Sequence, residues 1–369
     1  MHLEKLHLLN FKNYAEANLT FSPRINVLVG KNGSGKTNLL DAIFYLAFTK
    51  SAFSTTDQHC IQHEQPYFMV KGGFRTGNSS NEIVSSVQQG AKKVFREGVN
   101  EYEKLSDHIG KYPVILVAPD DVDLVKEGSE ARRKFFDGII SQLDKHYLED
   151  LIQYNHALKQ RNSFLKMAYE KGLTDWLTLD AYDQVLVKRG VPIFEKRLAF
   201  VKEFLPVFRK YYRFIVEENE VTDLAYVSPL QEKDFAAGLQ GTRQKDLALQ
   251  RTSFGIHRDD YIFTLEQGDL KRLGSQGQQK SFVIALKLAQ FEILKTHKGF
   301  KPILLLDDIF DKLDDFRISR LLALMKEDLG QLFITDARPD RTQGLLDQIH
   351  VEATVFTIEK GNVKLYERQ

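Results

Sequence analysis

GKNGSGKT, residues 30–37, is the stretch on which the fold class depends, because it fills the pattern G-x-x-x-x-G-K-[ST]. The apolar run INVLV stands before it at residues 25–29, and TNLLDAIFYLAF follows at residues 37–48 with apolar side chains at helical spacing. A strand, a glycine-rich loop and a helix in this order form the context in which the pattern cradles nucleotide phosphates. A glycine-rich turn before an ordinary helix is the alternative, and the flanking pattern disfavours it.

Each residue type in this loop suits one part of a bound nucleotide. The glycines allow positive φ and bring backbone N–H groups close to phosphate oxygens, beside the positive end of the helix dipole. Lys36 is expected to reach the β and γ phosphates of ATP, and Thr37 is expected to hold Mg²⁺ through its hydroxyl. The predicted ATP-binding set is Gly30, Lys31, Asn32, Gly33, Ser34, Gly35, Lys36 and Thr37.

The segment KPILLLDDIF, residues 301–310, supplies the acidic strand that such a loop requires. Its apolar run is typical of a strand buried on both faces. Asp307 falls at the end of that run and is predicted to join Thr37 in the magnesium shell. Asp308 is predicted to orient and deprotonate the attacking water, so the catalytic set is Lys36, Asp307 and Asp308. A buried strand ending in an ordinary acidic turn is the alternative.

A second anion site is predicted at GSQGQQK, residues 274–280, directly before a helix-like stretch. Ser275 is expected to cap that helix, and Gly277 would expose N–H groups at its N-terminus. We therefore predict that Ser275, Gly277 and Gln278 also contact ATP. The alternative is a helix cap without a ligand.

The order of cradle, Ser-x-Gly-Gln loop and Asp-Asp strand resembles the ABC-type ATPases. The resemblance implies that the loop of one subunit closes over ATP on the other, giving an ATP-dependent homodimer opened by hydrolysis. Leu313 and Asp314 match the loop after the acidic strand in that superfamily. Thr335 and Asp336 stand where many of its members have a histidine, which leaves the residue that senses the γ-phosphate open.

Between the cradle and the second loop, residues 119–251 carry helical patterns without a sustained heptad. Glycines and prolines interrupt these patterns at Gly138, Gly172, Gly190, Pro192 and Pro206. We predict an α/β fold, an ABC-type P-loop ATPase head with an inserted, mainly helical second lobe. The expected division is 1–118 and 251–369 for the head and 119–250 for the lobe.

Four segments resemble the RecF family of bacterial recombination-mediator ATPases, and they extend over nearly the whole chain. They are LHLLNFKNY (6–14), PDDVDLVKEGSEARRKFFD (119–137), GIHRDD (255–260) and SQGQQKS (275–281). Two places depart from the family pattern: Ile256 replaces a proline, and Asp311-Lys312 replace a small residue and a glutamate.

The resemblance implies a weak, DNA-stimulated ATPase of recombination, the SOS response and gap repair. It would be a cytoplasmic homodimer that binds duplex DNA near single-strand gaps and helps RecO- and RecR-type mediators load the recombinase. Net charge is only +1, so a DNA surface would have to be local. No apolar run approaches the roughly 20 residues that span a bilayer, so no membrane association is predicted.

One local basic stretch could form the DNA surface, because residues 151–213 hold 12 Lys or Arg against 6 Asp or Glu. The candidate contacts are Lys196, Arg197, Arg209, Lys210 and Arg213. The alternative is an amphipathic helix whose basic residues face water.

Two other functions remain open from the sequence. A P-loop phosphotransferase would use the acidic strand for magnesium alone and pass phosphate to a small acceptor. A nucleotide-gated protein scaffold would explain the missing histidine and the Asp311-Lys312 pair. Transfer of the γ-phosphate only to water would exclude the phosphotransferase. Turnover that depends on Asp308 would exclude the scaffold.

Overall fold

The computed structural model describes residues 1–172, 175–216, 220–266, 268–312, 314–326, 329–350 and 352–365. The chain forms two compact units. The head unit comprises Met1–Asp121, Phe214–Glu217 and Lys280–Gln369, and the lobe unit comprises Val122–Arg213 and Glu218–Gln279. The expected lobe boundary at residue 250 is therefore wrong, because residues 251–279 fold with the lobe.

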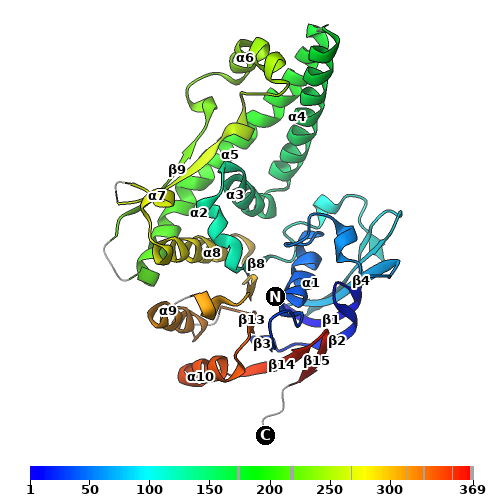
Figure 1. The fold of residues 1–369 in the computed structure, drawn as a ribbon, viewed down its shortest axis with the longest axis vertical. Coiled ribbons are helices and arrows are strands. Elements are labelled where there is room, and N and C mark those ends of the chain that lie inside the picture. Colours follow the sequence, from blue (N-terminus) through cyan, green and yellow to red (C-terminus); the bar gives the residue numbers. More distant parts are fainter. Residues whose placement is uncertain are drawn as a thin grey trace. The chain divides into compact units, whose positions relative to one another are not determined.

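The head unit contains a six-stranded sheet in which all neighbours pair in parallel except β14 with β15 (Figure 1). Every residue of β3, β8, β12 and β13 is buried, as expected of apolar runs in a sheet covered on both faces. The strands predicted at the cradle and at the Asp-Asp motif are confirmed. The sheet order is β15 (Asn362–Leu365), β14 (Ala353–Glu359), β3 (Ile25–Val29), β13 (Leu332–Asp336), β12 (Ile303–Leu306), β8 (Val114–Val117).

A second, antiparallel sheet of the head unit alternates buried and more exposed residues, as in β4. Helix α1 (Lys36–Phe48) contacts β4 of this sheet and β8 of the parallel sheet. Leu40, Ile43 and Leu46 of α1 therefore join one hydrophobic core with residues of both sheets. The antiparallel order is β2 (Tyr14–Thr20), β1 (His2–Phe11), β4 (Tyr67–Thr76), β5 (Ser79–Gln88), β6 (Val94–Glu97), β7 (Asn100–Glu101).

The remaining helices of the head unit lie before or between its strands in the sequence. Helix α8 (Gln276–Lys298) begins within the lobe unit's residues and ends within those of the head unit, directly before β12. Helix α9 (Asp315–Lys326) joins β12 to β13, and α10 (Pro339–Ile349) joins β13 to β14. Short 3₁₀ turns are η1 (Asp57–Cys60), η2 (Leu105–Asp107), η3 (Pro119–Val122) and η6 (Ile309–Lys312).

The lobe unit is mainly helical, as predicted, but it also contains a three-stranded antiparallel sheet in the order β11-β10-β9. Strand β10 pairs with β9, and this pairing ties residues after 250 to the lobe. The helices are α2 (Asp123–Lys126), α3 (Ser129–Leu143), α4 (Lys145–Lys171), α5 (Trp176–Val216), α6 (Phe235–Leu249) and α7 (Leu270–Leu273). The other elements are β9 (Thr222–Val227), β10 (Asp260–Leu265), β11 (Gly268–Asp269), η4 (Pro229–Gln231) and η5 (Ile256–Arg258).

Helix α5 runs unbroken through Gly190, Pro192 and Pro206, so the interruptions predicted at these positions are wrong. Gly190 is required by packing, because a Cβ there would lie 2.3 Å from the ring of Phe235. Gly138 likewise lies inside α3, whereas Gly172 ends α4 with φ +62 as a glycine C-cap. Four of the five predicted interruptions therefore lie inside helices.

Two distant sequence motifs meet inside the lobe unit. Arg132 donates to both carboxylate oxygens of Asp260, at 2.8 and 3.0 Å, and Arg133 donates to the backbone oxygen of Asp259 at 2.6 Å. These contacts join α3 to the GIHRDD segment. The two arginines are therefore held as structural cations of the lobe.

Arg197 is the centre of a buried ionic network, with 2% of its surface exposed. Its guanidinium donates to Asp259 at 2.6 Å and to Asp137 at 2.8 and 2.9 Å. Tyr226 also donates to the Asp259 carboxylate. A buried guanidinium that carboxylates already bind cannot reach a DNA phosphate, so Arg197 is removed from the predicted DNA contacts.

Replacing Arg197 should destabilise the lobe, because Arg197→Ala would leave the buried Asp259 and the partly buried Asp137 without their cation. We expect the free energy of unfolding to fall by about 3–5 kcal/mol, the cost of breaking a buried pair from one side. Denaturant unfolding followed by circular dichroism measures this loss. The matched control is Lys196→Ala at the adjacent, exposed position, which should change stability by about 1 kcal/mol or less. Equal stability of the two variants would contradict a structural role for Arg197.

Candidate nucleotide-binding site

Three neighbouring parallel strands bring the predicted site together at one edge of the sheet. Strand β13 lies between β3 and β12, and all three run in the same direction. Gly30 follows β3, Asp307 follows β12, and Asp336 ends β13. The backbone N–H of Gly30 donates to the backbone oxygen of Asp336 at 3.3 Å, which anchors the start of the loop to the middle strand.

The loop needs glycine at the positions that the sequence pattern marks. Gly33 has φ +78 and Gly35 has φ +119, a region that favours glycine. A Cβ on Gly35 would lie 2.5 Å from the Asn13 amide nitrogen. A Cβ on Gly30 would lie 2.3 Å from the backbone oxygen of Ile358.

The loop is braced from outside by the turn between β1 and β2. Asn13 donates from its side chain to the backbone oxygen of Ser34 at 3.0 Å, and Tyr14 donates from its hydroxyl to the oxygen of Gly35 at 2.9 Å. Asn38 of α1 donates to the Asn13 side chain at 2.7 Å. The sequence reasoning did not assign these roles, although the segment LHLLNFKNY that contains Asn13 and Tyr14 was singled out as a family motif.

The turn between β14 and β15 supports the same loop. The backbone N–H of Gly361 donates to the oxygen of Ser34 at 3.1 Å. Gly361 has φ +82, and a Cβ there would lie 2.3 Å from the backbone oxygen of Asn13. A hairpin more than 320 residues later in the chain therefore fits against the cradle only because this residue is glycine. Nothing in the sequence pattern pointed to it.

Polar groups converge inside the cradle. Lys36 is 4% exposed, and its ammonium donates to the backbone oxygens of Gly30 at 2.9 Å and Lys31 at 3.4 Å. The Ser34 hydroxyl is buried without a hydrogen-bond partner. Lys31, Asn32 and Gly33 are exposed on the rim. An ammonium, an unpartnered hydroxyl and the backbone of a glycine turn suit the oxygens of a phosphate chain.

Thr37 and Asp307 face one another across the site. The Thr37 hydroxyl lies 3.0 Å from both carboxylate oxygens of Asp307. Asp307 is 5% exposed, and burial raises its pKa above the ordinary value for aspartate. A positive ion beside this carboxylate would offset the free-energy cost of burying its negative charge. The hydroxyl and carboxylate are ligands that Mg²⁺ accepts when phosphates and water complete its shell, so these residues fit the predicted metal.

No cluster of three or more histidine, cysteine or acidic side chains suited to a metal occurs in the part of the chain that the structure describes. A magnesium ion at Thr37 and Asp307 would therefore depend on nucleotide phosphates for the rest of its ligands. This is the usual way in which Mg²⁺ is bound at sites of phosphoryl transfer.

Thr335 links the two acidic residues. Its hydroxyl donates to Asp307 at 2.8 Å and accepts a hydrogen bond from the backbone N–H of Asp308 at 2.8 Å. Asp308 has φ +44, an uncommon conformation that this hydrogen bond helps to hold. Thr335, one of the two residues that stand where many ABC-type ATPases have a histidine, thus positions Asp308. Asp336 accepts from the Arg338 backbone at 2.8 Å and from the Thr342 hydroxyl, so its carboxylate orients the start of α10.

The second predicted anion loop caps α8 as expected. The Ser275 hydroxyl accepts from the backbone N–H of Gln278 at 3.2 Å, and the Gln278 side chain accepts from the Ser275 N–H at 2.8 Å. The amide nitrogen of Gln278 also donates to Glu220 at 2.7 Å. These reciprocal bonds form a capping box that includes Gly277 within its first turn. The ATP contacts of this loop stay a prediction.

The loop after the acidic strand is described in part. Asp311 and Lys312 lie in the 3₁₀ turn η6, and Leu313 lies outside the described residues. Asp314 accepts from the backbone N–H of Arg317 at 2.9 Å, which caps the first turn of α9.

The remaining DNA candidates lie on α5, and their environments differ. Lys196 pairs with Asp144 at 2.8 Å, and Arg209 pairs with Asp223 at 3.1 Å. Lys210 and Arg213 are exposed. The Lys210 ammonium lies 5.4 Å from the centre of the Tyr211 ring. Lys196, Lys210 and Arg213 are thus exposed, whereas Arg209 is partly buried.

Comparison with known proteins gives one consistent family. The model of the RecF/RecN/SMC N-terminal domain matches residues 2–105. A DNA replication and repair protein RecF from Cytophaga hutchinsonii is 47% identical and covers 99% of this chain and 97% of its own length. The RecF of Flavobacterium johnsoniae is 46% identical over 97% of this chain and 100% of its own length.

Solved structures agree with the sequence relatives. A structure of the recombination mediator protein RecF-ATP in the RecFOR pathway is 29% identical, with a TM-score of 0.89 over 99% of this chain and 98% of its own. An Smc head domain from Pyrococcus furiosus is 18% identical, with a TM-score of 0.56 over 99% of this chain and 96% of its own, and shares the fold. The predicted fold class, an ABC-type ATPase head with an inserted lobe, is confirmed. In the described ranges, no helix has the length and apolar character needed to cross a membrane.

The contact between Gly361 and Asn13 yields a test of the cradle. Gly361→Ala should weaken ATP binding at least tenfold, because the new methyl group would push the β14–β15 turn away from Ser34 and loosen the loop. Titration with a fluorescent ATP analogue measures the affinity. Gly90→Ala is the matched control: Gly90 also has positive φ, +72, but a Cβ there meets nothing within 4 Å. Equal affinities in the two variants would show that the turn does not support the cradle.

Proposed function

The chain belongs to the RecF family, and from this premise we propose that it is an ATP-dependent DNA-binding protein of recombinational gap repair. ATP would join two copies, and the dimer would bind DNA near single-strand gaps and help RecO- and RecR-type mediators load the recombinase there. Slow hydrolysis of ATP, stimulated by DNA, would release it. The proposed location is the cytoplasm.

The observation that carries this proposal is the group formed by Thr37, Asp307, Thr335 and Asp308. It places one carboxylate against the cradle hydroxyl and holds the next carboxylate beside it through Thr335. Two adjacent acidic residues thus have different environments. Asp307 is buried and suited to a metal, whereas Asp308 is half-buried and available to water.

We assign the hydrolytic step to these residues. Mg²⁺ held by Thr37 and Asp307 would neutralise charge on the phosphates. Lys36 binds the β and γ phosphate oxygens, with backbone N–H groups of residues 30–37 around them. Asp308 orients a water molecule and accepts its proton as the water oxygen bonds to the γ-phosphorus. The bond from that phosphorus to the bridging oxygen breaks, and ADP leaves with that oxygen.

The second loop would complete the site from another copy of the chain. Its capping box fixes the first turn of α8, so the N–H groups near Gly277 are held in one orientation. We propose that Ser275, Gly277 and Gln278 of one copy contact the γ-phosphate bound to the cradle of the other. ATP would then bind the closed dimer more tightly than the separate chains, which is the condition for ligand-driven closure.

DNA contacts are proposed for the accessible cations of α5. Lys210 and Arg213 are exposed, and Lys196 and Arg209 make ion pairs at the surface that a DNA phosphate could replace. Binding through such residues neutralises phosphates and depends little on sequence but strongly on salt.

The role of Asp308 predicts a separation between binding and turnover. Asp308→Asn should lower the rate of ATP hydrolysis by about 100-fold or more, because the amide cannot accept the proton from water. ATP affinity and ATP-dependent dimerisation should persist. Phosphate release and analytical ultracentrifugation measure the two effects. Glu103→Gln, at an exposed acidic position of the head unit, is the control that should hydrolyse ATP normally. Unchanged turnover in Asp308→Asn would remove Asp308 as the base.

The DNA function predicts binding that requires ATP. Fluorescence anisotropy of a labelled gapped duplex should show binding with ATP and Mg²⁺, and weaker binding without them. Affinity should fall steeply between about 50 and 200 mM salt. The double change Lys210→Glu and Arg213→Glu should weaken binding, whereas Lys245→Glu, at an exposed position of α6, should have little effect. Absence of binding under every condition would refute the DNA function.

A further inference from the structure

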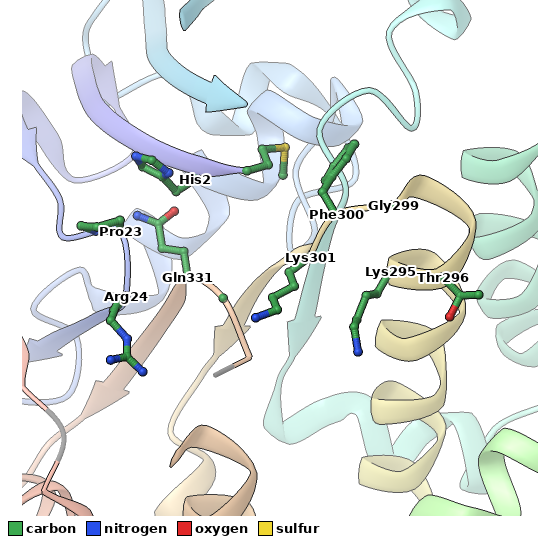
Figure 2. A pocket seen from close by; sticks show the side chains of 11 residues that line it. His2, Pro23, Arg24, Lys295, Thr296, Gly299, Phe300, Lys301 and Gln331 are labelled. Carbon is green, nitrogen blue, oxygen red and sulfur yellow. The ribbon is translucent and has the colours of Figure 1, made fainter. Parts of the chain in front are cut away.

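The head unit has a concave site at the opposite end of the strands that carry the nucleotide site. A cavity of about 740 Å³ opens where β3, β12 and β13 begin (Figure 2). Arg24 precedes β3, Lys301 precedes β12, and Gly330 and Gln331 precede β13. Strand β3 has five residues, so about 17 Å of strand separates this cavity from the cradle.

The cavity concentrates positive charge from three segments. Figure 2 shows the Lys301 side chain between Arg24 and Lys295, which belongs to the last turn of α8. Among the described residues that line the cavity, none carries a carboxylate. Lys295 also lies 3.3 Å from Glu292, outside the lining, whereas Arg24 is exposed. Lys301, too, has a further interaction. Three cations in one wall nevertheless favour an anionic ligand.

The wall is also partly apolar. Phe300, Met1 and Pro23 line the same space as the three cations. Carboxylates and an apolar side chain on one ligand would satisfy both features. A flexible acidic peptide can enter a cavity of this kind, whereas the phosphates of a duplex lie on a convex cylinder and reach protruding cations more easily. The shape and the mixed lining therefore favour a peptide over DNA.

We propose that this cavity, termed the basic pocket, binds an acidic segment of a protein partner. Carboxylates of the segment pair with Arg24, Lys295 and Lys301, and an apolar side chain packs on Phe300. Because the basic pocket lies at the strand ends away from the cradle, the segment binds whether or not ATP is present. This site gives the protein a contact with another protein that is separate from its nucleotide and DNA functions.

The test uses the full chain and a fluorescein-labelled octapeptide of Asp, Glu, Phe and Leu, titrated by anisotropy. We expect saturable binding that ATP does not alter. A peptide with Asn and Gln in place of the acids should bind at least tenfold more weakly. Arg24→Glu should weaken binding of the acidic peptide at least tenfold, as should Lys301→Glu. Lys104→Glu, at an exposed lysine outside the basic pocket, should leave it unchanged.

Several outcomes would overturn the proposal. One is equal binding of the neutral peptide, and another is unchanged binding by Arg24→Glu, whose exposed position makes misfolding a poor explanation. Displacement by pyrophosphate or by a short duplex at lower concentrations than by unlabelled peptide would identify a phosphate site instead. ATP hydrolysis and gapped-duplex binding of the same variants are measured in parallel. A variant that loses peptide binding but retains ATP hydrolysis and gapped-duplex binding would separate this site from the proposed function.

Discussion

Parallel pairing of β3, β13 and β12 is the constraint on which the rest of the head depends. Their apolar runs are buried completely, so the strands must lie within a sheet that is covered on both faces. Because they run in one direction, their carboxyl ends meet at one edge and their amino ends at the other. The first edge collects Gly30, Asp307 and Asp336, and the second collects Arg24 and Lys301. One pairing pattern thus creates both sites.

The cradle is held by parts of the chain that carry no nucleotide chemistry. The side chains of Asn13 and Tyr14, beside the antiparallel sheet, donate hydrogen bonds to backbone oxygens of the cradle. The backbone N–H of Gly361, in the last hairpin, does the same. A loop rich in glycine has many accessible conformations, and these bonds select one before any ligand binds. Thr335 acts in the same way on Asp308.

The lobe shows why charge in a sequence is a poor guide to a binding surface. Lys196 and Arg197 are neighbours in a basic stretch, yet one is largely exposed and the other is enclosed by Asp137 and Asp259. The carboxylates come from α3 and from the GIHRDD segment, 60 and 62 residues away from Arg197. Helix α5 passes two prolines for a related reason: packing along its length outweighs the local cost of each.

The sequence by itself determined the cradle, its strand and helix, the Asp-Asp strand and the cap of α8. Each of these features depends on residues that are close together in the sequence, because glycines, apolar runs and capping side chains act through local geometry. The tertiary structure alone decided which side chains from distant segments meet. In the tertiary structure Thr335 contacts Asp308, and Gly361 supports the cradle. Arg197 is buried in the lobe, and Arg24 and Lys301 line the basic pocket. The physical reason is that burial and pairing depend on neighbours supplied by chain folding, and no local pattern contains them.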